Sequence, residues 1–146
     1  MSAFIASLHY LALAIGFAGL VLRQYFIIAA KPNQSVKPVF LGDNLWGIAA
    51  LLWIVTGLLR AFGGLEKGTA FYLQNQWFFI KMGLFFFIFL LELYPMIKFI
   101  RWRMSKKKTI DSQDLFTLKT IGRINLIEVI LIILLIFTAS QMARGL

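Results

Sequence analysis

The chain lacks cysteine and holds very little histidine, proline or acid. Among its 146 residues there are no cysteines, one histidine, three prolines and six acidic residues. Without cysteine the chain forms no disulfide, thiolate metal site, iron–sulfur cluster or Cys-x-x-Cys-His haem attachment. One histidine without a close pair of carboxylates is also a poor copper or zinc site. A basic N-terminal segment with a cleavage pattern is missing too, so we expect the first apolar segment to remain as a helix.

What the chain has in excess is apolar sequence. Hydrophobic residues make up 60% of it and charged residues only 14%. Four apolar segments are each longer than the ~17 residues that cross a hydrocarbon core; they are residues 3–30, 44–62, 77–100 and 118–143. Inside a bilayer such a segment must be helical, because no water is there to bond its backbone polar groups. The sequence therefore predicts an all-α integral membrane protein, with a single transmembrane four-helix bundle that takes up residues 1–146.

The charged residues are distributed unevenly. The net charge is +9, and eight basic residues lie in or next to the third connection, in "KFIRWRMSKKK" and at Lys119 and Arg123. Cytoplasmic loops of membrane proteins carry an excess of Lys and Arg. We therefore expect the connections 31–43 and 101–117 to be cytoplasmic, with both termini on the outer face of a bacterial inner membrane. The lysine run is then an orientation signal and a contact for anionic lipids, so the expected partner is the lipid bilayer and not nucleic acid.

Polar residues and proline mark the expected helix ends. Asp43 or Asn44 is expected to cap the second helix. Pro95 is expected to kink the inner end of the third helix, because proline removes a backbone donor. The basic, amphipathic residues 96–104 are expected to continue along the membrane surface. Ser112 is a candidate cap for a short segment that leads into the fourth helix.

Ionisable residues inside spanning segments are rare and usually face the protein interior. Matched depth predicts one group near the inner ends of the helices: Arg23, Glu92, Asn125 and Glu128, with Asp43 and Arg123 nearer the surface. Arg23 has the charge to pair with Glu92 or Glu128. Two hypotheses remain open for this group. It is either a structural ion pair that holds the helices together, or a proton path through Glu92 and Glu128.

A second group is predicted near the outer ends and is mostly cationic. It contains His9, Arg60, Lys81, Met142 and Arg144. Its only nearby acid is Glu66, so the excess positive charge needs an anion, either lipid phosphate or the propionates of a haem. In the haem hypothesis His9 binds the iron, and the stripe of small residues at 12, 16 and 19 leaves room for the flat ring. The iron is then five-coordinate, takes a weaker sixth ligand such as Met142, or is shared by the His9 side chains of two chains. In the alternative, His9 is a hydrogen-bonded core residue and the cations extend to lipid headgroups.

Several segments resemble known families. The segments "LHYLALAIGFAGL", "IVTGLLR", "WFFIKMGLFFFIFLLEL" and "IGRINLIEVILIILLI" look like those of the HemJ-type protoporphyrinogen oxidases, and the CopD-like membrane proteins are similar. The residues that carry this resemblance are His9, Thr56 with Gly57, Trp77 with Lys81, and the set Arg123, Asn125 and Glu128. The loop "EKGTAFYLQNQWFFIKM" and the terminal "MARG" are similar to an uncharacterised bacterial family of small four-helix membrane proteins.

The resemblance to HemJ proteins implies haem b bound through His9 and, beyond that, porphyrinogen chemistry. Under this hypothesis the protein is a membrane b-type haem protein with redox activity, and the other four residues of the outer group contact the cofactor. Lys81, Glu92 and Glu128 are the candidate catalytic residues, and a porphyrin or a quinone is the candidate partner. A haem shared by two His9 side chains would require a homo-oligomer. The alternative is a non-catalytic membrane subunit, assembly factor or small transporter without a cofactor.

Overall fold

The computed structural model describes residues 2–64 and 69–144. Its helices are α1 (Ser2–Ala29), α2 (Lys37–Phe62), α3 (Thr69–Gln74), α4 (Gln76–Met104) and α5 (Ser112–Arg144). The four long helices, α1, α2, α4 and α5, are each long and apolar enough to cross a membrane. The predicted all-α membrane fold with four spanning helices is thereby confirmed.

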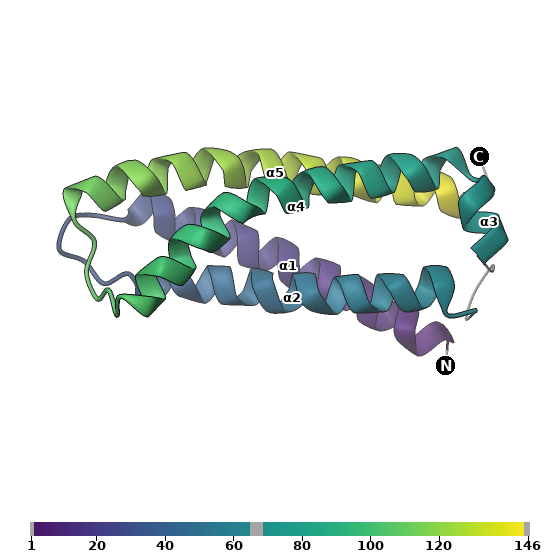
Figure 1. The fold of residues 1–146 in the computed structure, drawn as a ribbon, viewed down its shortest axis with the longest axis horizontal. Helices are drawn as coiled ribbons and strands as arrows, with labels where there is room; N and C mark the ends of the chain where they lie inside the picture. Colours follow the sequence, from purple (N-terminus) through teal and green to yellow (C-terminus); the bar gives the residue numbers. More distant parts are fainter. Residues whose placement is uncertain (1, 65–68, 145–146) are drawn as a thin grey trace.

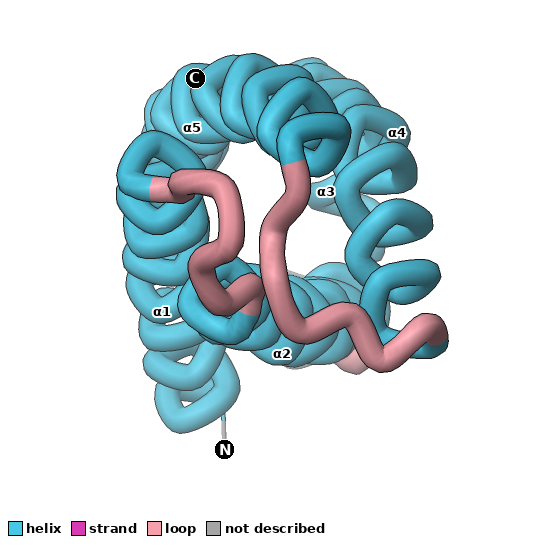
Figure 2. Tube along the Cα trace, turned by 90° about the vertical axis from the view of Figure 1, so that its left-hand side faces the viewer, coloured by secondary structure: helices cyan, strands magenta, loops and turns pink. Residues whose placement is uncertain are grey.

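The four long helices run side by side as one elongated bundle (Figure 1). The short helix α3 and both chain termini lie at one end of the bundle, which we call the α3 end. Residues 30–36 and 105–111 connect the helices at the other end, which we call the loop end. Seen from the loop end, the long helices follow one another around the bundle in the order α1, α2, α4, α5 (Figure 2). Side chains from all four helices can therefore meet in the middle.

Helix α2 begins earlier than the sequence predicted. It starts at Lys37, with Pro38 in its first turn. Proline suits this position because the first backbone N–H groups of a helix have no partner within the helix. The predicted start at Asn44 is wrong, and neither Asp43 nor Asn44 caps the helix. Asp43 lies inside α2 and is buried, so its carboxylate can contact side chains in the interior of the bundle.

Two further predicted helix boundaries near the loop end, at residues 100 and 118, are also wrong, because both lie inside longer helices. Helix α4 passes through the buried Pro95 and ends at Met104, so residues 96–104 belong to this helix and not to a separate surface segment. Helix α5 starts at Ser112 and not at 118. Asp111 and Asp114 form its cap, because each carboxylate accepts the backbone N–H of the other residue at 2.8 Å, as in a capping box. The predicted cap, Ser112, is thus already the first helical residue.

Apolar side chains fill the bundle and also cover its outside. A cluster in the middle of the bundle includes Trp46, Trp53 and Ile132, and further clusters lie toward the loop end and beside α3. On the outside, Ile130 and Phe137 are each more than half exposed. A helix that is apolar on every side is typical of a membrane span, so the protein contacts the lipid bilayer through the sides of the bundle.

The two connections at the loop end are bonded to each other. The Asn33 N–H donates to the Ile110 carbonyl at 2.8 Å, and the Ile110 N–H donates to the Gln34 carbonyl at 2.9 Å. Lys107 forms ion pairs at 3.1 and 2.6 Å with the two aspartates of the α5 cap. Burial lowers the pKa of the Lys107 ammonium, but hydrogen bonds and charge from these aspartates outweigh it, so that pKa lies above its ordinary value. The backbone bonds between the connections join the pair α1 and α2 to the pair α4 and α5, and the Lys107 ion pairs fix the second connection against the start of α5.

Candidate functional site

The most polar part of the interior surrounds Arg23, which α1 holds at 0% exposure. Its Nη1 and Nη2 atoms donate to the two carboxylate oxygens of Glu92 on α4, at 2.8 and 2.9 Å. Nη1 also donates to Asp43 on α2 at 3.1 Å, and Nη2 donates to Glu128 on α5 at 3.0 Å. Nε donates to the side-chain oxygen of Asn125 at 2.8 Å. We call these five residues the Arg23 cluster, and they come from all four long helices.

The side-chain amide of Asn125 is fixed by two further hydrogen bonds, which its nitrogen donates to α1. Its Nδ2 atom donates to the Leu20 carbonyl oxygen and to Oε1 of Gln24, both at 3.1 Å. These two bonds turn the amide oxygen toward Arg23. Asn125 and Glu128 are three residues apart and therefore share one face of α5, so a single rotation of this helix presents both to the guanidinium.

A second arginine extends the cluster toward the loop end. Arg103, in the last turn of α4, donates from Nη2 to Oδ2 of Asp43 at 2.6 Å and to the side-chain oxygen of Asn44 at 2.8 Å. The Arg103 side chain is 35% exposed, whereas that of Arg23 is fully buried. Asp43 therefore bridges a buried arginine and a partly exposed one.

Carboxylates outnumber arginines in this network. Arg23 and Arg103 together face the three acids Asp43, Glu92 and Glu128, so the fully ionised set carries one negative charge in excess. The Glu128 side chain is 0% exposed, and its Oε1 atom has no hydrogen-bond partner among the residues that the structure describes. A buried carboxylate oxygen without a donor is unfavourable. A proton held by Glu92 or Glu128 would remove the excess charge.

The predicted pairing of Arg23 with Glu92 and Glu128 is confirmed, since Arg23 bonds to both. The prediction that Asp43 lies nearer the surface is wrong, because the earlier start of α2 places it in the cluster. Arg103 was missed, although it follows Glu92 by about three helical turns and so shares its face of α4. Arg123 is exposed and lies outside the cluster.

His9 is buried between α1 and α2, at 8% exposure. Its Nδ1 atom lies 2.8 Å from the Thr56 hydroxyl oxygen, which in turn lies 2.7 Å from the Leu52 carbonyl oxygen. A hydroxyl has one hydrogen, which Thr56 donates to Leu52, so Nδ1 of His9 donates to Thr56. The lone pair of neutral His9 is then on Nε2, as in a histidine that binds a metal through Nε2. Gly57 makes room for the ring, because a Cβ atom there would lie 3.3 Å from Cε1 of His9.

The stripe of small residues beside His9 does not leave the space that the haem hypothesis needs. Ala12 is 1% exposed, and a Cβ atom on Gly16 would lie 3.1 Å from the Trp46 ring. A Cβ atom on Gly19 would lie 2.7 Å from the Trp46 backbone nitrogen, which is too close for a side chain. The prediction that this stripe accommodates a flat ring is therefore wrong. Small residues let α1 and α2 pack directly on each other instead.

The other members of the predicted outer group have different surroundings. The guanidinium carbon of Arg60 lies 5.5 Å from the centre of the Tyr10 ring, a cation–π contact. Met142 packs against the apolar cluster beside α3. Lys81 is half-buried on α4 and Arg144 is exposed at the end of α5, while Glu66 lies outside the described residues. Within the described residues no three histidine, cysteine or acidic side chains are grouped as metal ligands.

The spanning helices and the apolar exterior define a class, that of small helical integral membrane proteins, here with an ionic cluster inside. A family model described as "Predicted membrane protein (DUF2214)" matches residues 1–146. The chain therefore belongs to the DUF2214 family of predicted membrane proteins, which agrees with the similarity to a family of small membrane proteins. No curated protein and no solved structure matches the chain, so the resemblance to HemJ-type and CopD-like proteins gains no support.

Proposed function

We propose that this protein binds and releases a proton within the membrane at Glu92 and Glu128, as the proton site of a proton-coupled carrier or membrane oxidoreductase. The observation that carries the proposal is Oε1 of Glu128, a buried carboxylate oxygen without a hydrogen-bond donor among the described residues. Ionisable residues inside a membrane commonly mark ion pathways and proton relays. A neutral carboxyl group is less costly to bury without a partner than a carboxylate, so a proton on this pair lowers the cost of the unpartnered Oε1 atom.

A purely structural ion pair needs fewer carboxylates than the three that surround Arg23. One carboxylate neutralises one guanidinium, and Glu92 already binds Arg23 through both of its oxygens. Asp43 and Glu128 add two more negative charges, of which Arg103 neutralises one. The remaining charge is neutralised when Glu92 and Glu128 share one proton, as carboxylates do when they occupy the same site.

The cluster also has a route for the proton to reach water. Arg23 keeps its proton, because a guanidinium does not deprotonate in a protein, so the proton moves between carboxyl groups. The Glu92 side chain is 17% exposed, whereas that of Glu128 is fully buried, and Asp43 connects the cluster to the partly exposed Arg103. Arg103 lies in the last turn of α4, next to the loop end. Proton exchange with water therefore takes place from the loop end.

Infrared spectroscopy of the purified protein tests this proposal, because a protonated carboxyl group has a C=O stretching band that a carboxylate lacks. Wild-type protein should show such a band near neutral pH, and the band should shift in D₂O. It should be missing from Glu128→Gln, which keeps the shape of the side chain but does not titrate. Asp111→Asn removes an exposed carboxylate and is the matched control, which should keep the band. A spectrum that Glu128→Gln and Glu92→Gln both leave unchanged would reject the proton site.

Haem b is a second candidate, and the His9–Thr56 hydrogen bond favours it because it fixes the tautomer with the lone pair on Nε2. In this hypothesis His9 binds the iron, a porphyrin or quinone is the redox partner, and propionates bind the outer cations Arg60, Lys81 and Arg144, with Met142 nearby. The tight contact between α1 and α2 does not fit a haem ring along the stripe at 12, 16 and 19.

The visible absorption spectrum tests the haem hypothesis. Protein purified from cells supplied with a haem precursor should show a Soret band that His9→Ala loses while the variant still folds. A colourless wild-type protein would reject haem. Together with an unchanged infrared band in Glu128→Gln, it would favour a non-catalytic membrane subunit, assembly factor or small transporter.

A further inference from the structure

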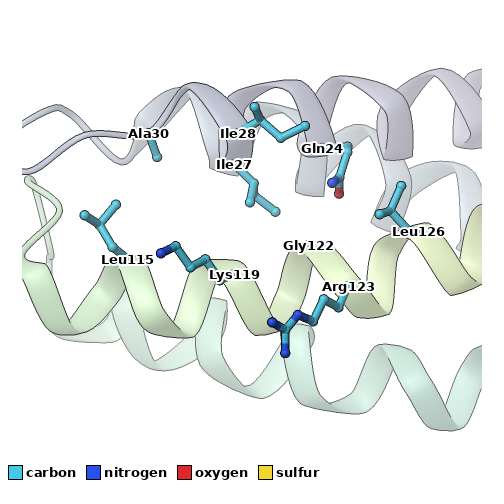
Figure 3. A pocket seen from close by; sticks show the side chains of 9 residues that line it. All are labelled: Gln24, Ile27, Ile28, Ala30, Leu115, Lys119, Gly122, Arg123 and Leu126. Atoms are coloured by element: carbon cyan, nitrogen blue, oxygen red, sulfur yellow. The ribbon is translucent and has the colours of Figure 1, made fainter.

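A groove of about 330 Å³ opens on the side of the bundle between α1 and α5, near the loop end. Its α1 wall includes Gln24 and Ile28, and its α5 wall includes Lys119, Arg123 and Leu126. Figure 3 shows the residues of α1 along one side of the groove and those of α5 along the other. The groove is separate from the Arg23 cluster, since no member of that cluster lines it.

The polar part of the groove is positively charged. Lys119 and Arg123 are four residues apart and so are neighbours on one face of α5, and no acidic residue lines the groove. Both side chains are exposed, and neither forms a hydrogen bond or ion pair within the part of the chain that the structure describes. Two like charges one turn apart repel each other, so an anion that contacts both is favoured there.

Apart from Gln24, the rest of the groove is apolar and faces the lipid. Ile28 is 75% exposed and Leu126 is 51% exposed. Lys119 follows the start of α5 by about 10 Å along the helix axis, and both basic side chains extend toward the loop end in Figure 3. Along α5 the cations therefore lie between Leu115, at the loop end of the groove, and Leu126, which lies deeper in the bilayer.

From this charge, depth and apolar wall, we propose that the groove binds one phospholipid with an anionic headgroup. Its phosphate lies between Lys119 and Arg123, and an acyl chain covers Ile28 and Leu126. Basic pockets between spanning helices are suited to such headgroups. A soluble phosphate would use the two cations but would leave the apolar wall uncovered. Gln24 connects the lipid to the Arg23 cluster, because its Oε1 atom accepts from Asn125.

Native mass spectrometry of the detergent-purified protein tests this site, with phosphatidylglycerol and phosphatidylcholine as the two probes. Wild type should retain phosphatidylglycerol and not phosphatidylcholine. The double variant Lys119→Gln, Arg123→Gln should bind phosphatidylglycerol at least about tenfold more weakly, because each basic residue at an anionic surface contributes ~1 kcal/mol. Leu126→Ser should also weaken binding, because it makes the apolar wall polar.

The matched control is the double variant Lys106→Gln, Lys108→Gln, which removes the same charge from exposed loop positions. It should bind phosphatidylglycerol like wild type, and circular dichroism should show equal helix content in all variants. If the control variant lost as much phosphatidylglycerol binding as the groove variant, the proposal would be overturned, because lipid binding would then depend on the net charge of the protein and not on the groove. Displacement of the lipid by inorganic phosphate, or equal retention of phosphatidylcholine, would overturn it as well.

Discussion

Arg23 uses every donor that its side chain has. A guanidinium carries five N–H groups, and the five hydrogen bonds of Arg23 reach Asn125, Asp43 and Glu128 once each and Glu92 twice. The partners lie on three other helices, so the geometry of one side chain depends on the placement of the whole bundle. Loss of this one residue therefore affects every helix contact at its level.

We expect Arg23→Leu to lower the free energy of unfolding by about 3–5 kcal/mol, because it leaves buried carboxylates without their partner. Arg23→Lys should lower it less than Arg23→Leu but should not match wild type, since an ammonium does not form the bidentate contact with Glu92. Thermal melting in detergent measures both effects. Arg101→Leu removes an exposed arginine and is the control. Equal melting of Arg23→Leu and Arg101→Leu would show that Arg23 faces lipid or water.

Only part of this cluster could be predicted from the sequence. The position of Arg23, Glu92 and Glu128 within apolar segments fixes their depth, and matched depth was enough to pair them. Asp43 was misassigned because a polar "GDN" before an apolar segment has the pattern of a helix N-terminus. The contact of His9 with Thr56 depends on how α1 is rotated against α2. Helices that are apolar on every side carry little periodicity from which to infer that rotation.

At the scale of elements, the short distance between α1 and α2 depends on glycine residues, which have no side chain to hold the two backbones apart. A Cβ atom on Gly42 of α2 would lie 2.5 Å from the backbone nitrogen of Arg23, so no larger residue fits without moving a helix. This contact brings the backbone of α2 against the turn of α1 that carries Arg23. The depth of the guanidinium therefore depends on a glycine of the neighbouring helix.

We expect Gly42→Ala to destabilise the protein by roughly 1–3 kcal/mol, because the added methyl group forces α1 and α2 apart. Gly47→Ala is the matched control on the same helix, since a Cβ atom there meets nothing within 4 Å. It should leave the stability unchanged or raise it by up to ~1 kcal/mol through helix propensity. Thermal melting of both variants in the same detergent gives the comparison. If Gly42→Ala melts no lower than Gly47→Ala, the close contact is not present in the membrane protein.

The apolar segments predicted that each spanning helix exists but not where it ends. Helices α2 and α5 begin at Lys37 and Ser112, well before the predicted 44 and 118. Hydropathy falls where charged residues begin, whereas backbone hydrogen bonding continues through them into the interface. The six-residue α3 (Thr69–Gln74) was not predicted at all, because a helix this short shows no periodic pattern of its own.

At the scale of the whole molecule, the basic residues predict that the loop end is cytoplasmic. The chain contains no cysteine, so a single introduced cysteine is the one position that a thiol reagent can label. We expect a membrane-impermeant thiol reagent added to intact cells to label Ser2→Cys and not Lys106→Cys. After the membrane is permeabilised, both positions should react. Labelling of Lys106→Cys from outside would reverse the orientation, and the proton site would then exchange with the outer face.

The wide separation in sequence between Arg23 and its partners has a consequence for biosynthesis. The ribosome makes α1 first, and Asp43, Glu92 and Glu128 follow 20, 69 and 105 residues later. An arginine within a spanning helix disfavours insertion by ~2.5–3.5 kcal/mol, and α1 must bear this while most of its partners are not yet translated. The nascent α1 can keep the guanidinium near the headgroups only by staying shallow at its loop end. We therefore expect a chain that ends after α2, and so lacks Glu92 and Glu128, to insert less completely than the full-length chain.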